Sequence, residues 1–301
     1  MFFFLLFAFT TFLFRNAFTT YFFNDDFFFL KISRISSFDQ FINFFSPIRQ
    51  ASYKPISQET FYFLTHLQKE NIFLAHLLVF FIYFIGLYYL YKIIFLLTKN
   101  KPLSFLTTFF YGINFTHVFQ LYYLATFQDI IIFTFLCLAF YNFLKNKRIL
   151  SIAFFILALL SKETAILFVP FLILFKLFFD KKISWKSLLP YLILGITFSL
   201  IYQYSLKYVI ALDNYKINFN PRLVVNNLMW YFLWSLGLPN FMPDYMVSIF
   251  KPPIREFDKL LTNFPSIKIF LYSLLSYFGI LLVTIFVYLR ENKSRLKEFF
   301  L

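Results

Sequence analysis

Residues 72–98 read IFLAHLLVFFIYFIGLYYLYKIIFLLT, an apolar stretch that decides the class of fold. A helix of about 20 such residues crosses the hydrocarbon core of a bilayer. Further apolar stretches fill much of the chain, at residues 1–22, 103–125, 129–144, 149–160, 164–179, 187–206 and 267–289, with a more polar candidate at 223–241. The sequence therefore predicts an all-α, polytopic transmembrane helical bundle, with about eight or nine spans at this helix length.

The composition of the 301 residues points to the same class of protein, since 60% are hydrophobic and only 14% are charged. Soluble domains are about half apolar and a quarter charged. Most of the surface is therefore expected to face lipid, and the mean hydropathy of +0.71 agrees. The formal net charge of +14 suits the basic cytoplasmic loops of a membrane protein, so nucleic acid is not an expected partner.

Basic clusters between the apolar stretches predict the orientation of the chain. By the positive-inside rule these clusters are cytoplasmic, and they comprise Lys99 and Lys101, then Lys145, Lys147 and Arg148, then Lys181, Lys182 and Lys186, and finally Arg290, Lys293, Arg295 and Lys297. The turns between them are then exoplasmic and the N-terminus is cytoplasmic. Because the clusters that flank residues 187–289 need an even number of spans between them, an interfacial or re-entrant segment is favoured for residues 223–241.

These features predict a multi-pass integral membrane protein of a bacterial plasma membrane with a single transmembrane domain over residues 1–301. Residues 1–206 form its core module, and residues 207–301 carry the exoplasmic or re-entrant segment and the final span. The first exoplasmic loop, residues 24–70, is polar. Within it, apolar residues of 28–42 recur every three or four positions, which predicts amphipathic helices that lie in the membrane surface.

Acidic residues directly after the first apolar stretch are candidates for a catalytic base. Asp25 and Asp26 are adjacent, and because like charges disfavour double ionisation, one carboxyl is expected to have a raised pKa and to accept a proton near neutral pH. The alternative is a solvated loop start. Arg15, within the first apolar stretch, either extends to the interface or faces the bundle interior.

Lysines beside apolar stretches on the predicted exoplasmic side are candidate functional residues, because a charge inside a bilayer costs about 2.5–3.5 kcal/mol. Lys54 precedes Pro55 and offers a cation to a phosphate, or anchors a lipid headgroup. Lys162 lies in a short turn between two apolar stretches. It either pairs with the neighbouring Glu163 or binds an anionic lipid phosphate.

The outer ends of the third and fourth apolar stretches carry His117 and Asp129. His117 is either a hydrogen-bonded core histidine or a supporting residue of the site. Asp129 either caps the N-terminal end of an apolar helix, where a carboxylate is favoured, or belongs to the site. Motifs for nucleotide phosphates and for zinc are missing from the sequence, so no metal and no cofactor is expected, although the acidic pair could hold a divalent cation.

Taken in chain order, these elements resemble the GT-C superfamily of membrane glycosyltransferases, and most of all its protein O-mannosyltransferase-like and aminoarabinose-transferase-like members. The stretches that carry the resemblance are residues 15–26, 53–56, 117–129, 159–170 and 221–245. The resemblance implies an inverting transfer of a sugar from a polyprenyl-phosphate donor to a lipid, glycan or protein acceptor. It also implies Asp25 or Asp26 as the catalytic base and Lys162, with Lys54 and Arg15, as ligands of the donor phosphate.

The sequence departs from the family at one position, since the H-x-E pattern that many relatives carry reads His117, Val118 and Phe119 here. Two other functions stay open. A transporter or lipid flippase also needs charges within the membrane, but it predicts interrupted helices and charges near the midplane. A non-catalytic membrane subunit would use the outer loop to bind a partner.

Overall fold

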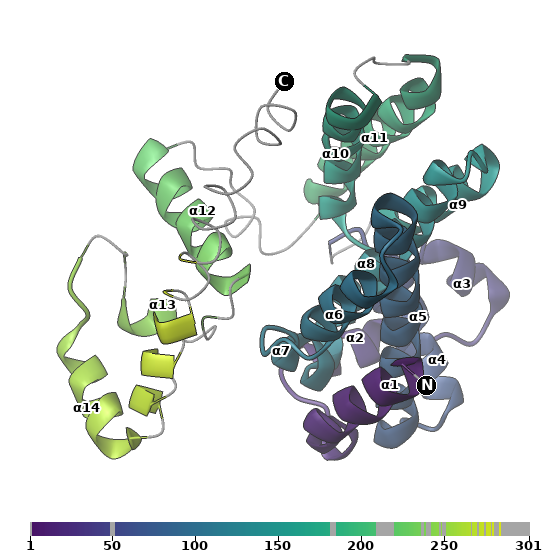
Figure 1. The fold of residues 1–301 in the computed structure, drawn as a ribbon. Helices are drawn as coiled ribbons and strands as arrows, with labels where there is room; N and C mark the ends of the chain where they lie inside the picture. The colour runs from purple at the N-terminus through teal and green to yellow at the C-terminus, as the bar shows by residue number, and fades with distance from the viewer. Residues whose placement is uncertain are drawn as a thin grey trace. The chain divides into compact units, whose positions relative to one another are not determined.

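The computed structural model of the chain describes residues 2–48, 52–180, 185–208, 220–235, 238, 242–246, 248, 251–265, 267–269, 271–273, 275–277, 279 and 283. The chain divides into two compact units, Met1–Lys216 and Ile217–Leu301. All regular secondary structure of the described residues is helical (Figure 1), which confirms the predicted all-α class.

The first unit contains the helices that carry the predicted site. Its α-helices are α1 (Phe2–Leu13), α2 (Asp25–Ile32), α3 (Phe38–Asn43), α4 (Phe61–Leu67), α5 (Ile72–Thr98), α6 (Lys101–Gly112), α7 (His117–Tyr122), α8 (Phe127–Leu144), α9 (Arg148–Leu159), α10 (Phe168–Phe175) and α11 (Trp185–Leu206). Short 3-10 helices span Arg15–Thr19, Leu124–Thr126 and Glu163–Leu167, and π-helices span Ile56–Thr60 and Lys176–Asp180.

Among the described residues, three helical segments are long and apolar enough to cross a membrane, namely Ile72–Thr98, Leu124–Leu144 and Trp185–Leu206. The first forms without interruption because nearly all of its residues are apolar and its start is capped. The Asn71 side chain accepts a hydrogen bond of 3.1 Å from the Leu74 amide, which satisfies one of the free N–H groups of the first turn. These three helices support the prediction of a membrane protein.

The other predicted spans of the first unit form shorter helices. The stretch 103–125 breaks after Gly112 into α6 and α7, because the Asn114 side chain accepts hydrogen bonds from the amide and hydroxyl of Thr116 and forms a turn there. The stretch 1–22 forms the 12-residue helix α1 and then a 3-10 helix. The stretch 149–160 forms α9, also of 12 residues, and 164–179 alternates between 3-10, α and π geometry.

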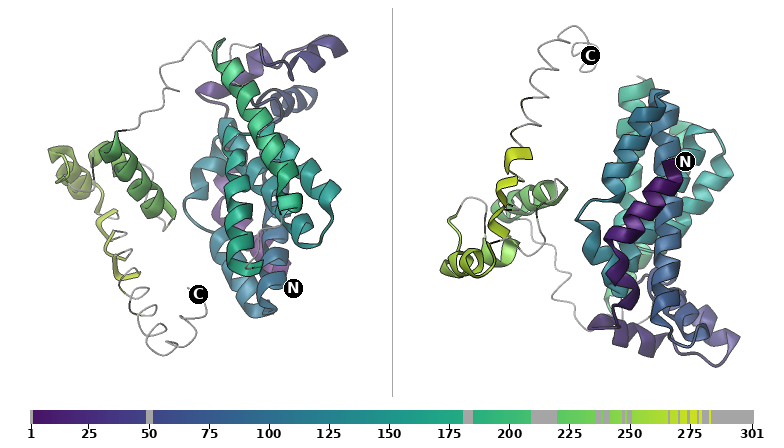
Figure 2. Two further views of the ribbon diagram at one scale, coloured as in Figure 1. Left: turned by 90° about the horizontal axis from the view of Figure 1, so that it is seen from above. Right: turned by 60° about the horizontal axis from the view of Figure 1, so that its bottom comes forward.

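Helices α5 and α8 run in the same direction, side by side, and α9 returns along α8 (Figures 1 and 2). Near the start of α5, His76 bonds the Leu121 carbonyl, which precedes α8. Farther along, Tyr89 of α5 packs edge-on against Tyr141 of α8, with ring centroids 5.2 Å apart. The turns after α5 and α8, which carry basic residues, therefore lie at one end of these helices. The residues before α5, before α8 and after α9 lie at the opposite end.

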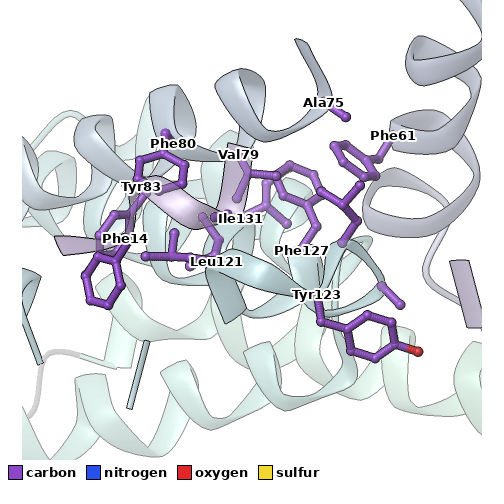
Figure 3. Close-up of a cluster of buried hydrophobic side chains, with 14 of the residues drawn as sticks. Phe14, Phe61, Ala75, Val79, Phe80, Tyr83, Leu121, Tyr123, Phe127 and Ile131 are labelled. Atoms are coloured by element: carbon purple, nitrogen blue, oxygen red, sulfur yellow. The ribbon is translucent and has the colours of Figure 1, made fainter. Parts of the chain in front are cut away.

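A cluster of buried side chains joins the loop of residues 24–70 to this bundle (Figure 3). Phe61 of α4 is 1% exposed and stacks on Phe127 at the start of α8, with ring centroids 4.1 Å apart. Ala75 and Val79 of α5 belong to the same cluster. The loop is therefore folded onto the helix ends by apolar packing, which the hydrophobic effect stabilises.

The amphipathic helices predicted in residues 28–42 correspond to α2 and α3. Ser37 ends the intervening segment because its side chain caps α3, accepting a hydrogen bond from the Gln40 amide. Phe29 and Leu30 of α2 are buried, whereas Phe27 and Phe28 are exposed. The apolar periodicity of this region is thus divided between a packed face and an outer face.

The second unit contains α12 (Pro221–Ser235), α13 (Met242–Tyr245) and α14 (Arg255–Asn263) among its described residues. The 15 residues of α12 fall short of the about 20 needed for a span. Helix α12 occupies most of the stretch 223–241, for which the sequence favours an interfacial or re-entrant segment. The stretch 267–289 is described only in pieces, and the basic cluster at residues 290–297 lies outside the described residues.

Candidate active site

A tight turn at residues 23–26 presents the acidic pair. The Asp26 amide donates to the Phe23 carbonyl at 3.1 Å, and the Phe23 amide donates to Asp26 Oδ2 at 3.0 Å. Asn24, within the turn, has φ 50° and ψ −120°, a backbone conformation that favours glycine. The backbone between the two hydrogen bonds is therefore held in one shape just before α2 begins.

Asp26 is fully buried and surrounded by hydrogen-bond donors. The Tyr62 hydroxyl of α4 donates to its Oδ1, and the Ala125 amide also contributes a hydrogen bond. Burial raises the pKa of the Asp26 carboxyl, and the hydrogen bonds from Tyr62, Phe23 and Ala125 oppose that rise. Burial, with Asp26 beside it, also raises the pKa of the Tyr62 hydroxyl, so Tyr62 remains a donor. Asp26 thus ties α2 to α4 and to the approach to α8.

Asp25 is exposed, although its backbone is fixed. Its amide donates to the Tyr123 hydroxyl at 3.0 Å, and the Tyr123 ring stacks on Phe23 at 4.5 Å. Burial, together with the adjacent Asp25, raises the pKa of Tyr123 to about 12. The Tyr123 hydroxyl points away from the hydrophobic cluster (Figure 3). The accessible carboxylate of the pair is therefore Asp25.

Two lysines and two carboxylates meet in a second polar group. Lys54 Nζ lies 3.3 Å from Glu163 Oε2, and Lys162 donates to Asp129 Oδ1. Burial lowers the pKa of the Lys54 ammonium, and the charge of Glu163 opposes this effect whereas that of Lys162 adds to it. Lys162 pairs with Asp129, so the alternative in which it pairs with the neighbouring Glu163 is wrong. We call Lys54, Asp129, Lys162 and Glu163 the charge quartet.

Hydrogen bonds between separate segments hold the quartet in place. The Ile56 amide donates to the Leu160 carbonyl at 3.2 Å, and the Ser57 hydroxyl donates to the Ser161 carbonyl. Residues that follow Lys54 are therefore fastened to the turn that precedes Lys162. The ring of Tyr53 also packs on Phe198 of α11, with centroids 6.2 Å apart.

The start of α8 connects the acidic pair with the charge quartet. The Ala125 amide reaches Asp26, and Asp129 belongs to the quartet. Four residues of chain span at most about 14 Å when fully extended. The two polar groups therefore lie at the same end of the helices, close to one another.

Arg15 and His117 have other surroundings. Arg15 lies after the end of α1, is exposed, and donates to the Phe12 carbonyl at 3.0 Å. The His117 ring packs against the rings of Tyr83 and Tyr111, at 5.4 and 4.8 Å. The structure therefore records neither residue in contact with the acidic pair or the quartet. His117 is half-buried among these rings, and its Nε2 atom has no hydrogen-bond partner among the described residues, unlike the hydrogen-bonded core histidine that the sequence offered as one alternative.

The tyrosines that organise the acidic pair are absent from the residues singled out in the sequence. Tyr62 lies 36 residues from Asp26 and Tyr123 lies 98 from Asp25. Tyrosines are frequent here, at 21 in the chain, so their presence alone carries no signal. Within the described part of the chain, no three His, Cys, Asp or Glu side chains converge as metal ligands would.

No family model, curated protein or solved structure matches this chain significantly.

Proposed function

We propose that the protein is a membrane glycosyltransferase that moves a sugar from a polyprenyl-phosphate donor to an acceptor. The observation that carries the proposal is the meeting of Lys54 and Lys162 at the helix end that also presents the exposed Asp25. Such a donor needs cations for its phosphate and a base for the acceptor. Both kinds of group lie near the start of α8.

The charge quartet suits a phosphate that gains charge during the reaction. An ammonium group has three N–H donors, so Lys162 retains donors after its bond to Asp129. Preorganised donors aimed at developing charge lower the barrier to reaction. In the free protein the carboxylates of Asp129 and Glu163 neutralise the two lysines, which lowers the free-energy cost of placing those lysines beside a bilayer.

The reaction is a direct displacement at the anomeric carbon. The acceptor oxygen or nitrogen forms a bond to that carbon while the bond from the carbon to the phosphate oxygen breaks. Asp25 takes the proton of the acceptor, and the departing polyprenyl phosphate carries the electron pair of the broken bond to Lys162 and Lys54. The single displacement inverts the anomeric centre, and it requires no covalent sugar intermediate and no cofactor.

We infer further that this helix end faces the exoplasm, since the basic turns after α5 and α8 lie at the opposite end. The three long helices and the shorter apolar helices together would supply about eight spans of a plasma membrane protein, with the N-terminus in the cytoplasm. The acceptor is a lipid, a glycan or a protein. Asp26 is assigned the role of positioning Asp25.

Release of polyprenyl phosphate from a donor labelled in its lipid, measured with the purified protein in detergent, tests the proposal. We expect Asp25→Asn to slow release by about 100-fold or more, because a positioned base contributes at least that factor. Lys162→Gln is expected to slow it by a similar factor, because it removes a donor to the phosphate.

Asp39→Asn is the matched control, since Asp39 is an exposed carboxylate of the same loop on α3. Its rate should equal that of the unmodified protein. An unchanged rate in Asp25→Asn rejects the base assignment. Failure of the unmodified protein to release the lipid phosphate from any of a panel of pentosyl and hexosyl donors rejects the transferase itself.

A further inference from the structure

The π-helix Ile56–Thr60 buries polar side chains whose role the proposed reaction leaves unexplained. Gln58 is 4% exposed, and its Oε1 atom has no hydrogen-bond partner among the described residues. Buried polar atoms are almost always hydrogen-bonded, because an unsatisfied one loses its bonds to water without replacement. π-helical turns inside helices are also frequent at functional sites. An unsatisfied amide oxygen on a π-helix is therefore a candidate ligand contact.

Gln58 is placed beside the charge quartet by its backbone. The Gln58 amide donates to the Lys54 carbonyl at 3.0 Å, which gives the two residues the spacing of one helical turn. Lys54 pairs with Glu163, and the Ser57 hydroxyl donates to the Ser161 carbonyl, next to Lys162. The backbone of Gln58 therefore lies close to the charge quartet.

Two more buried oxygens near this helix also lack partners within the described part of the chain, Thr60 Oγ1 and Gln128 Oε1. The ring stack of Phe61 on Phe127 brings the segments that carry them together, since Thr60 precedes the first ring and Gln128 follows the second. Buried oxygens without hydrogen-bond partners thus occur on both of the segments that this ring contact brings together.

We propose that Gln58, with Thr60 and Gln128, binds hydroxyl groups of the sugar whose phosphate is bound by Lys54 and Lys162. This inference rests on the proposed function and extends it with a sugar subsite. Amide and hydroxyl oxygens accept hydrogen bonds, and sugar hydroxyls donate them. A phosphate is fully ionised or nearly so and supplies acceptors, so it suits the lysines and not the amide oxygens of Gln58 and Gln128. The polar groups therefore divide between the two parts of one ligand.

The subsite predicts a conflict between ligand binding and stability. A site that hydrogen-bonds a hydroxyl discriminates strongly against a ligand that lacks it. Replacing an unsatisfied buried polar group by an apolar one of similar shape is neutral or stabilising. Gln58→Met should therefore weaken binding of the sugar and at the same time keep or raise the unfolding temperature of the ligand-free protein.

The test compares two probes, polyprenyl phosphate and a panel of the same lipid phosphate carrying one pentose or hexose. We expect the unmodified protein to bind at least one sugar-bearing probe about tenfold more tightly than the plain lipid, a difference of about 1.4 kcal/mol. Gln58→Met should abolish this preference and leave the Kd for the plain lipid unchanged. Gln40→Met is the control, because Gln40 is exposed and accepts from the Ser36 amide, and it should keep the preference.

Several outcomes overturn the subsite. One is a Gln58→Met protein that retains the sugar preference, and another is one that unfolds at a lower temperature, which would mean that Gln58 is bonded within the protein. A third is an unmodified protein that prefers no sugar in the panel. The proposed function fails separately, if sugar-bearing lipids are bound with the expected preference and no lipid phosphate is released.

Discussion

At the scale of single residues, the acidic pair shows how burial divides two identical neighbours. Asp26 is enclosed by Tyr62, Phe23 and Ala125, whereas Asp25 is exposed and only its amide is fixed. A carboxylate that accepts hydrogen bonds on all sides is poorly placed to accept a proton from a substrate. The environment, rather than the residue type, therefore makes Asp25 the candidate base of the proposed reaction and gives Asp26 structural contacts.

The raised pKa of Asp26 predicts a pH dependence of stability. A carboxyl whose pKa is higher in the folded protein than the ordinary 3.8 binds more protons when folded, so folding is favoured at low pH. Its contribution is complete below the ordinary pKa and is lost as pH rises towards the raised value. The unfolding temperature of the unmodified protein, relative to that of Asp26→Asn, should therefore fall as pH is raised above about 4.

Asp39→Asn provides the comparison, because Asp39 is exposed on α3. The difference between its unfolding temperature and that of the unmodified protein should stay constant over the same pH range. If the Asp26→Asn difference is equally flat, burial does not disfavour the ionised form of Asp26.

The residues of the candidate site were predictable to the extent that they interrupt apolar sequence. Asp25, Asp26, Lys54 and Lys162 are conspicuous because charge is costly beside lipid. Their partners were not predictable, because Tyr62 and Tyr123 are amphipathic residues of a kind common throughout this chain. Lys162 pairs with Asp129 and not with the neighbouring Glu163, and this too depends on contacts between distant segments.

At the scale of elements, the contact between α5 and α8 is set by one glycine. A Cβ atom on Gly86 would lie 2.6 Å from atoms of both Phe133 and Thr134. Thr134 is itself fixed, since its hydroxyl donates to the Ile82 carbonyl of α5 at 2.9 Å. The two helices approach closely at this point because Gly86 has no side chain.

Gly86→Ala should therefore separate α5 from α8 and destabilise the protein, by about 1–3 kcal/mol as overpacked cores generally do. The measurement is the free energy of unfolding in mixed detergent. Gly279→Ala is the matched control, because no described atom lies within 4 Å of its Cβ position, and alanine there should be neutral or stabilising. Equal stability of the two variants would contradict the close approach.

Helix lengths also explain where the span prediction differs from the structure. Hydropathy averages over neighbouring residues, so it joins α6 and α7 into one apolar stretch. The hydrogen bonds of the Asn114 side chain to Thr116 end that helix early. Such local competition between a side chain and the backbone is difficult to predict within an apolar sequence. Helix α5, which has no such interruption, matches its predicted limits of residues 72–98.

At the scale of the whole molecule, the parallel course of α5 and α8 in the first unit has a consequence for topology. It puts the basic turns that follow them at one end and the charge quartet at the other. If the membrane lies across these helices, the two ends face different compartments.

Cysteine labelling with a membrane-impermeant maleimide in intact cells tests this orientation. The chain has one cysteine, Cys137, which is buried, so Cys137→Ala provides a background without thiols. We expect Asp39→Cys to be labelled from outside, and Lys101→Cys and Lys147→Cys to be labelled only after the membrane is permeabilised. Labelling of all three from the same side would remove the basis for an exoplasmic site.

The sequence by itself determined the all-helical class, the membrane-crossing character of residues 72–98 and the charged residues that lie beside apolar stretches. These are properties of consecutive residues, and hydropathy and helix periodicity measure them directly. Only the tertiary structure decided that Asp25 is accessible while Asp26 is enclosed, and that Lys54, Asp129, Lys162 and Glu163 meet. The reason is that these contacts join segments far apart in the chain, whose approach depends on how the loop 24–70 packs onto the helix ends.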